Sequence, residues 1–207
     1  ADLLETLADP PTGRTTRLEG IFGLCFRDAA GRISEATGAA LAPSSLDDCG
    51  SPLQDGLLPA AGELTQINVE WTRGCPLSCA FCTWPRRQRR VRHFSSDYIA
   101  RDIAWVLGAG YERVLICDPA INFKTSWLRL LVKTIEASDP EQRITFDAFL
   151  QYPCLSAEQA ELLPRVRWDR LMLGLQTDDA EGLAALNRPR FVRERFEFAP
   201  LFKANQL

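Results

Sequence analysis

The sequence predicts an α/β protein in which helices cover a parallel β-sheet, and three observations favour this class. From residue 66 onward, short β-rich runs alternate with longer segments whose apolar residues recur at helical spacing. The run 113–117 is apolar and continuous, which is typical of a parallel strand covered on both faces. Residues that begin or end helices stand between these segments.

Residues 66–70 form the first expected strand, which leads directly into a cysteine-rich loop. The helix after this loop begins at Ser95 or Ser96, either of which can act as an N-cap, and ends at Gly108 and Gly110. Its inward face is a set of apolar residues at helical spacing: Ile99, Ile103, Val106 and Leu107. The apolar run described above is then the second strand.

The second helix is expected to begin with Thr125 as its cap and to end at Asp139 and Pro140. Its inward stripe consists of four apolar residues: Leu128, Leu131, Val132 and Ile135. Residues 144–150 are rich in β-forming side chains and form the third expected strand.

A third, short helix follows, because Ser156 and Gln159 have the spacing of a capping box and Pro164 limits the helix. Residues 168–175 form the fourth expected strand. The fourth helix is delimited by three residues: Asp178 and Glu181 at its start and Pro189, which breaks it. The sequence therefore predicts four consecutive strand–helix units.

Residues 1–62 have a different character from the remainder. Two β-like stretches, 21–26 and 32–34, flank a hairpin turn at 28–31. The rest of this segment is rich in Pro, Gly, Ser and Asp and lacks the apolar residues for a core of its own. We therefore expect an N-terminal connector over 1–62 and an α/β core over 63–207.

The composition is that of a soluble globular protein, with 46% hydrophobic and 25% charged residues in 207. No apolar run approaches the ~18–20 residues that span a bilayer, and no charged-then-apolar leader opens the sequence. We expect a cytoplasmic protein that does not associate with membranes. A net charge of -3 gives no overall attraction for a polyanion, so nucleic acid is not an expected partner.

Five arginines follow the cysteine-rich loop within a window of seven residues: Arg86, Arg87, Arg89, Arg90 and Arg92. Two interpretations stay open. The run is either a solvated loop or a site for an anionic, phosphate-bearing ligand, because guanidinium groups bind phosphate in a bidentate manner.

Three of the seven cysteines, Cys75, Cys79 and Cys82, stand in a CxxxCxxC pattern. Thiolates select zinc, copper(I) or iron–sulfur clusters. A structural metal site closes its coordination shell with protein ligands, whereas a catalytic site leaves one position open for a substrate or cofactor. Three thiolates without an evident fourth ligand therefore indicate an open site. The other cysteines are expected to be free thiols that do not bind the metal: Cys25, Cys49, Cys117 and Cys154.

Two other interpretations of these cysteines fit less well. A zinc site needs a fourth ligand, and the single histidine, His93, lies eleven residues after Cys82 inside the arginine-rich run. Cys79 and Cys82 alone form a C-x-x-C pair of the thioredoxin type, but this leaves Cys75 unexplained.

The run 71–85 resembles the cluster loop of the radical S-adenosylmethionine (radical SAM) enzymes, in which an aromatic residue precedes the last cysteine, as Phe81 does here. The resemblance implies a 4Fe–4S cluster bound by three cysteines, with SAM on the open iron. It also implies a partial TIM-like (β/α)6 barrel. Four of its units are visible, so the last two are expected to be absent from this chain, disordered, or supplied in another way.

The sequence of residues 18–58 resembles the connector between the cobalamin-binding domain and the barrel in the cobalamin-dependent branch of that family. The alternative is an ordinary N-terminal extension. The histidine signature D-x-H-x-x-G is not present in the sequence. If cobalamin binds, its main domain is therefore expected outside this chain, or it binds without a histidine ligand.

Candidate site residues lie where predicted strands end, since the loops at the carboxyl ends of barrel strands converge. The resemblance places Asp118 near the amino group of SAM, although Asp-Pro-Ala replaces the Gly-Gly-Glu of the family here. It implies further contacts to SAM: Gln176 and Thr177 at the ribose and methionyl parts, Arg188 at the carboxylate, and Phe81 and Trp84 against the adenine. Helix capping for Thr177, a surface position for Arg188 and core packing for the aromatics stay open as alternatives.

Gln151 and Tyr152, which follow the third strand, are candidate substrate contacts, and no catalytic residue is identified. The resemblance predicts an enzyme that cleaves SAM and functionalises an unactivated carbon, with cobalamin-dependent methyl transfer as its reaction. The alternatives are a cobalamin-free enzyme acting on a peptide or RNA, or a non-enzymatic iron–sulfur or zinc module. Expected partners are a small-molecule or peptide substrate and an electron donor such as flavodoxin or ferredoxin.

Overall fold

The computed structural model describes residues 18, 21, 24–28, 30–34, 43–62, 64–84, 90–177 and 179–188. The chain divides into two compact units, residues 1–44 and residues 45–207. The boundary expected at residue 62 therefore falls inside the second unit. Among the described residues, no helix has the length and apolarity needed to cross a bilayer.

The first unit contains the predicted hairpin. Arg27 and Ile33 form an antiparallel bridge. The Asp28 carboxylate closes the turn, because its Oδ1 accepts hydrogen bonds of 2.9 Å from the backbone N–H groups of Ala30 and Arg32. Aspartate is common in turns because its carboxylate can accept hydrogen bonds from backbone N–H groups of the same turn. The hairpin prediction is confirmed.

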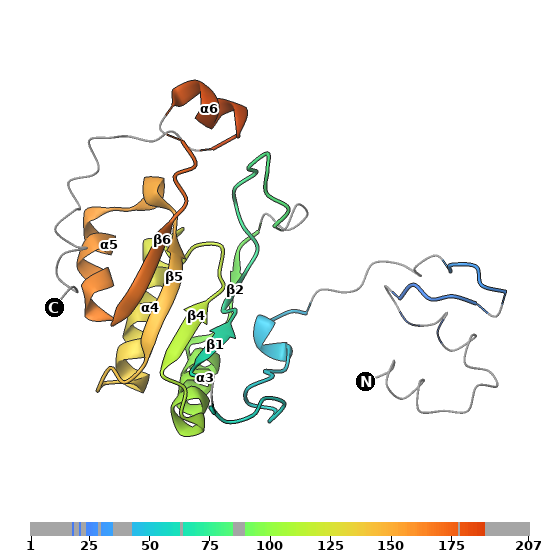
Figure 1. The fold of residues 1–207 in the computed structure, drawn as a ribbon, viewed down its shortest axis with the longest axis horizontal. Helices are drawn as coiled ribbons and strands as arrows, with labels where there is room; N and C mark the ends of the chain where they lie inside the picture. Colours follow the sequence, from blue (N-terminus) through green and yellow to red (C-terminus); the bar gives the residue numbers. More distant parts are fainter. Residues whose placement is uncertain are drawn as a thin grey trace. The chain divides into compact units, whose positions relative to one another are not determined.

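The second unit is a four-stranded parallel sheet in the order β1-β4-β5-β6 (Figure 1). Its strands are β1 (Gln66–Val69), β4 (Arg113–Ile116), β5 (Thr145–Leu150) and β6 (Trp168–Leu173). Its helices are α3 (Ser96–Ala109), α4 (Thr125–Ser138), α5 (Ala157–Leu162) and α6 (Ala180–Ala185). Short 3-10 turns cover Leu46–Asp48, Tyr152–Cys154 and Leu163–Arg165. The predicted α/β class and the four strand–helix units are confirmed.

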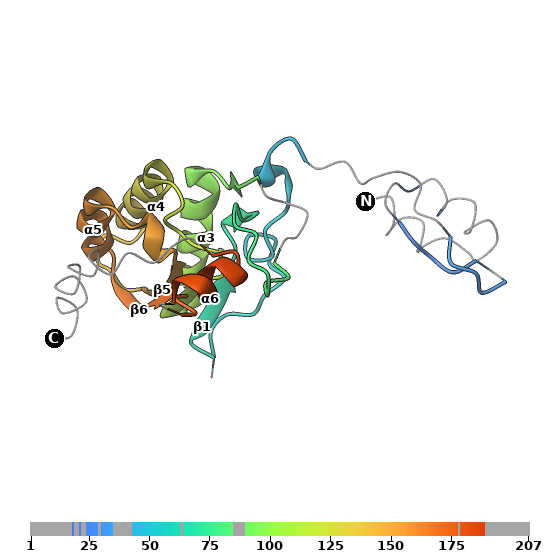
Figure 2. The ribbon, with the colours of Figure 1, turned by 90° about the horizontal axis from the view of Figure 1, so that it is seen from above.

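Three of the helices, α3, α4 and α5, lie in a row on one face of the sheet (Figure 2). They pack against alternate strand residues, all buried: Ile67, Val69, Val114, Ile116, Phe146, Ala148 and Leu150. Each large apolar side chain buried here contributes roughly 1.5–3 kcal/mol relative to exposure. This layer provides the stable base from which the loops at the strand ends project.

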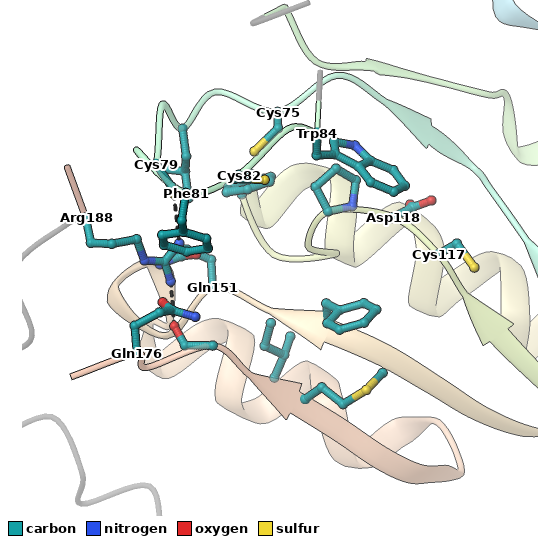
Figure 3. Close-up of a pocket in the computed structure, with 17 residues that line it drawn as sticks. Cys75, Cys79, Phe81, Cys82, Trp84, Cys117, Asp118, Gln151, Gln176 and Arg188 are labelled. Carbon is teal, nitrogen blue, oxygen red and sulfur yellow. Dashed lines mark hydrogen bonds between the residues drawn. The ribbon is translucent and has the colours of Figure 1, made fainter. Parts of the chain in front are cut away.

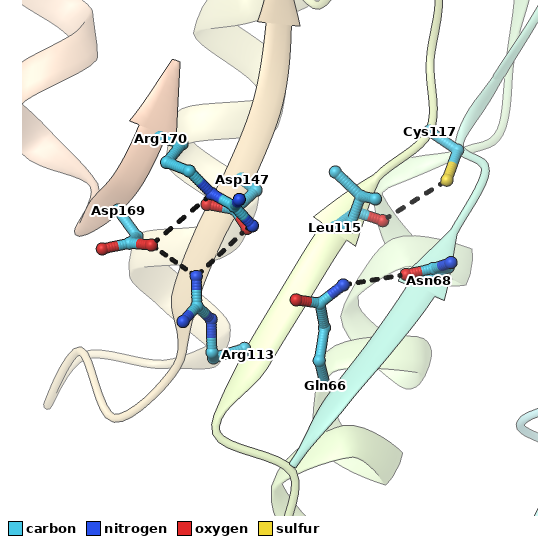
Figure 4. Close-up of polar contacts among 8 residues, drawn as sticks. All are labelled: Gln66, Asn68, Arg113, Leu115, Cys117, Asp147, Asp169 and Arg170. Atoms are coloured by element: carbon cyan, nitrogen blue, oxygen red, sulfur yellow. Dashed lines mark hydrogen bonds and ion pairs between the residues drawn. The ribbon is translucent and has the colours of Figure 1, made fainter. Parts of the chain in front are cut away.

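The opposite face of the sheet is polar near the strand starts, so the two-sided apolar cover expected for 113–117 is not found in the described residues. Asp147 Oδ2 accepts hydrogen bonds from Arg113 Nη2 at 3.3 Å and from Arg170 Nη2 at 2.7 Å. Asp169 pairs with both arginines (Figure 4). Leu115, which lies between this network and the strand end, is only partly buried.

Two helix starts differ from the sequence prediction. Lys124, not Thr125, occupies the N-cap position of α4. The Thr125 hydroxyl instead accepts a hydrogen bond of 3.1 Å from Gln159 Nε2. Ser156 caps α5 as predicted, but the Gln159 side chain bonds to Asn122 rather than returning to the cap, because Asn122 offers it a buried partner. Asp178 and Pro189, expected to delimit the fourth helix, lie outside the described residues, and Asp179 caps α6.

Residues 45–62 pack on α3 rather than forming a separate segment. Leu46 and Leu53 are buried in the main core. The buried Asp102 carboxylate of α3 accepts hydrogen bonds from Ser51 Oγ at 2.8 Å and from Gln54 Nε2 at 2.6 Å. Its other oxygen accepts from Trp71 Nε1 at 3.0 Å, which links this segment to the end of β1.

A small antiparallel hairpin that the sequence did not predict follows β1. It consists of β2 (Thr72–Arg73) and β3 (Arg92–His93). Residues 74–91 connect these two strands and contain all three cysteines of the CxxxCxxC pattern. The hairpin therefore places the cysteine loop at the carboxyl end of the parallel sheet, the end at which α6 also lies (Figure 1).

Candidate functional site

The cysteine loop begins with a backbone conformation that glycine adopts more readily than any other residue. Gly74 has a φ of 94°, in the left-handed region, and it turns the chain out of β2 directly before Cys75. Within the loop, the Cys82 N–H donates to the Cys79 carbonyl oxygen at 3.1 Å. All three cysteines are partly buried.

A cavity of about 350 Å³ lies against this loop and the strand ends (Figure 3). Most residues singled out in the sequence line it: Cys75, Cys79, Phe81, Cys82, Trp84, Asp118, Gln176 and Arg188. Thr177 does not line it; its hydroxyl accepts a hydrogen bond from the Asp179 N–H at 3.1 Å, in the turn before α6. Tyr152 is buried outside the lining, whereas Gln151 belongs to it.

Beyond the loop, the cavity lining is mainly apolar, and its members were not among the residues predicted from the sequence: Pro119, Phe123, Phe149, Leu150 and Met172. Phe149 and Met172 stand two residues beyond Asp147 and Arg170 on their strands, and therefore on the same face of the sheet. The period of two within each strand was the available signal. Phe149 and Met172 therefore line the cavity, and the ionic network of Figure 4 follows two residues earlier on the same strands.

Asp118 is the fully buried acid of this site. Its Oδ1 accepts hydrogen bonds from the N–H groups of Trp71 at 2.8 Å and Thr72 at 2.9 Å. Within the described residues, Oδ2 is buried without a hydrogen-bond partner. Burial raises the pKa of Asp118 to about 7, against the lowering effect of these hydrogen bonds. One oxygen therefore holds the base of the cysteine loop, and the other is available to a ligand.

His93 is connected to this acid through Thr72. Its Nδ1 lies 3.0 Å from Thr72 Oγ1, and the Thr72 backbone N–H donates to Asp118 Oδ1. The His93 ring stacks on Trp127 with centroids 4.0 Å apart. Burial, and then the charge of Lys124, lowers the pKa of His93 to about 4.

Gln151 provides a second buried polar group at the cavity. Its backbone N–H donates to Asn122 Oδ1 at 2.7 Å, and its carbonyl accepts from Asn122 Nδ2 at 3.0 Å. These bonds fix its backbone, while its side-chain Nε2 is buried without a partner among the described residues. The Gln151 amide is therefore positioned as a free donor.

Gln176 and Arg188 meet at Gly174, where β6 ends. Gln176 has a φ of 61°, a strained conformation for a residue with a side chain. A Cβ on Gly174 would lie 2.9 Å from Gln176 Nε2 and 3.7 Å from Arg188 Nη2. Glycine at this position therefore leaves the space that both side chains occupy.

The three cysteines line one cavity and have the soft thiol ligands that iron–sulfur clusters use. Burial raises the pKa of the Cys75 thiol, and the neighbouring Cys79 and Cys82 raise it further while Arg188 opposes them. In the described part of the chain, no three His, Cys, Asp or Glu side chains are grouped to hold a single metal ion. A cluster attaches each thiolate to a different iron, so it requires thiolates around one space, as the cavity provides.

Cys117, which the sequence predicts to be a free thiol that does not bind the metal, also lines the cavity. It lies at the end of β4, and its Sγ is 3.9 Å from the Leu115 carbonyl oxygen. Figure 3 shows it on the far side of Asp118, away from the cysteine loop. Its exclusion from the ligand set stays a prediction.

Comparison with known proteins shows which family this chain resembles. The family model of the radical SAM superfamily matches residues 69–207. No curated protein sequence matches the chain. Similar solved structures include the radical SAM methyltransferase TsrM from Kitasatospora setae with tryptophan substrate and a SAM analogue (17% identity, 69% of this chain, 29% of that chain, TM-score 0.59). They also include the cobalamin-dependent SAM radical enzyme OxsB with aqua-cobalamin bound (14% identity, 100% of this chain, 30% of that chain, TM-score 0.67).

The chain spans less than a third of the length of these two solved proteins. At such low identity the likeness concerns the fold. The family model, by contrast, covers well over half of the 207 residues and includes the cysteine loop, the strand ends and α6. The chain belongs to the radical SAM superfamily.

Proposed function

We propose that this chain supplies the first four strand–helix units of the barrel of a radical SAM enzyme, with a 4Fe–4S cluster bound by Cys75, Cys79 and Cys82. The observation that carries the proposal is the single cavity that these cysteines share with Asp118 and Arg188. When bound, the reduced cluster supplies the electron that cleaves SAM. The protein's own contribution is to hold, orient and desolvate the reactants.

The described residues divide these tasks between them. Asp118 Oδ2 accepts a hydrogen bond from the amino group of SAM, since a buried acceptor without a partner is stabilised by a cationic or metal-bound amine. Phe81 and Trp84, which are 52% and 49% exposed, cover the adenine. The apolar wall formed by Phe149 and Met172 excludes water from the reacting atoms.

The reaction we propose is methyl transfer to an unactivated carbon with cobalamin. Two observations support it: the connector-like residues 18–58 and the likeness to OxsB, whose structure contains aqua-cobalamin. Residues 86, 87 and 89 of the arginine run lie outside the described residues, and binding of the cobalamin phosphate tail by this run is part of the proposal. The proposal also includes two partners: a small-molecule or peptide substrate, and an electron donor such as flavodoxin or ferredoxin.

Anaerobic reconstitution of the chain tests the cluster. About four irons and four sulfides per chain are expected. Cys79→Ala should abolish the charge-transfer absorption, whereas Cys154→Ala, which removes a partly buried thiol outside the cavity lining, should leave it unchanged. One zinc without sulfide, or a normal cluster in Cys79→Ala, would contradict the proposal.

The cobalamin proposal needs a separate measurement. The complete gene product is purified with hydroxocobalamin supplied, and bound cobalt and corrin absorbance are determined. One cobalt per chain is expected. Sub-stoichiometric cobalt beside an intact cluster would favour the cobalamin-free enzyme acting on a peptide or RNA.

A further inference from the structure

A segment directly after α6, residues 186–188, contacts the cysteine loop from a distance of 109 positions in the sequence. The Leu186 carbonyl oxygen accepts a hydrogen bond of 2.9 Å from the Ala80 N–H. Asn187 Nδ2 donates to the Ser78 carbonyl oxygen at 2.9 Å and to Ser78 Oγ at 2.6 Å. These bonds fix the loop immediately before and after its middle cysteine.

Arg188 contacts that cysteine itself. Its Nη1 donates to Cys79 Sγ at 3.3 Å, and its Nη2 donates to the Gly174 carbonyl oxygen at 2.5 Å (Figure 3). The guanidinium is therefore held between the thiol and the end of β6. Because both ends of the planar group are engaged, its charge stays beside the sulfur.

The segment is itself rigidly attached to α6. The Leu186 N–H donates to the Gly182 carbonyl at 3.0 Å, and the Arg188 N–H donates to the Leu183 carbonyl at 2.8 Å. Asn187 between them has a φ of 50°, a left-handed conformation that asparagine adopts more readily than most residues with a side chain. The bonds of its amide to Ser78 join this turn to the loop, so the turn and the loop stabilise each other.

We propose that residues 186–188 form a clamp that positions the cluster loop, and that Arg188 donates a hydrogen bond to the Cys79 sulfur in the loaded protein and raises the reduction potential of the cluster. The inference rests on the proposed function, in which Cys79 is a ligand. It assigns Arg188 to the ligand sulfur, whereas the family resemblance suggested the SAM carboxylate.

The physical reason is charge. Reduction adds an electron to a cluster that thiolates already make negative, and a permanent cation with an N–H donor at one sulfur stabilises the reduced form more than the oxidised form. Removal of that donor therefore makes reduction less favourable. Arg188 is then a positioning and tuning residue, since it acts on the cluster through Cys79.

Redox titration of the reconstituted full chain without SAM tests the role of Arg188. Arg188→Gln is expected to shift the midpoint potential to a more negative value. Arg188→Lys keeps the charge but loses the planar pair of N–H donors, so its midpoint potential is expected to lie between those of the wild type and Arg188→Gln. An unchanged potential in both variants, together with a tenfold or greater loss of SAM affinity, would assign Arg188 to the SAM carboxylate and overturn the proposal.

The clamp is tested by the rate at which a chelator removes iron. Asn187→Gly permits the positive φ and removes the side chain that bonds to Ser78, so it is expected to lose iron several-fold faster than the wild type. Gln142→Gly is the matched control, because Gln142 also has a positive φ, 49°, and lies before β5 away from the cavity. Ser78→Ala combined with Asn187→Gly should add little to Asn187→Gly alone.

The outcomes separate this inference from the proposed function. If the wild-type chain takes up no iron and sulfide, the cluster assignment itself fails. If the wild type binds the cluster but Asn187→Gly releases iron at the wild-type rate, the clamp is wrong and the cluster assignment stands.

Discussion

At the scale of single residues, Asp118 joins the folding of the cysteine loop to its chemistry. The same carboxyl group holds the N–H groups of Trp71 and Thr72 and faces the cavity. A buried carboxyl with a pKa raised to about 7 is costly to ionise at neutral pH. A cationic group from a ligand would remove that cost, so binding and ionisation at this residue are linked.

The free energy of unfolding of the apo chain should depend on pH through Asp118. Its pKa is higher in the folded state than the ordinary aspartate value of 3.8, so its stabilising contribution is complete below about pH 4 and is lost as the pH rises through 7. Asp118→Asn keeps the acceptor oxygen and cannot ionise. The variant should match the wild type at pH 4 and exceed it at pH 8 by up to about 4 kcal/mol, measured by urea unfolding.

Glu141→Gln, at a side chain that is 77% exposed, is the control for that experiment. A parallel loss of stability with rising pH in the wild type and in Asp118→Asn would show that another group is responsible.

His93 should remain neutral well below the usual pH for histidine. Its pKa is lowered to about 4 from 6.5, so its contribution to stability is present above pH 6.5 and is lost as the pH falls through 4. Nitrogen-15 NMR is a direct measurement, because the chain has one histidine. We expect a neutral ring at pH 5.5, and the same spectrum shows which ring nitrogen carries the proton toward or away from Thr72. A doubly protonated ring at that pH would contradict the lowered pKa of His93.

At the scale of elements, the anchoring of residues 45–62 on α3 depends on one carboxylate. Asp102→Ala removes the acceptor for Ser51, Gln54 and Trp71 at once and leaves buried donors without partners. The expected loss is about 3–5 kcal/mol in urea unfolding. Asp97→Ala, at an exposed position in the first turn of the same helix, should cost no more than about 1 kcal/mol.

Periodicity located the main elements, since large apolar faces leave a strong signal over ten or more residues, as in α3 and α4. The failures were local. Thr125 and Gln159 are suitable capping residues, but their side chains hydrogen-bond to residues of other elements instead. A single sequence does not show that such tertiary hydrogen bonds replace the capping bonds. The strands β2 and β3 have two residues each, too few for a periodic pattern.

The candidate site was predictable to the extent that its residues belong to a motif or to a strand end. This covers the three cysteines and Asp118. Phe149 and Met172 were missed because their strands also contain core residues, and only the assembled sheet shows which face is open. The contacts of Asn187 to Ser78 join positions far apart in the chain, and no local pattern encodes them.

At the scale of the whole molecule, the two compact units predict how the chain tolerates shortening. A chain of residues 45–207 keeps Leu46, Leu53 and the Asp102 network, so it should unfold at the same urea midpoint as the full chain and take up the same iron. A chain of residues 63–207 loses these contacts and should unfold at a lower midpoint. Equal midpoints for the two shortened chains would support the boundary at residue 62 instead.

The contact between residues 186–188 and the cysteine loop also has a consequence for biosynthesis. A ribosome adds roughly 5–20 residues per second, so the 109 positions that separate the two partners take on the order of 5–20 s to synthesise. During that interval the three thiols stand on a loop without its partner, open to oxidation and to adventitious metals. A cluster delivered during translation would meet an unformed site. Cluster delivery is therefore expected to follow the completion of β6 and α6.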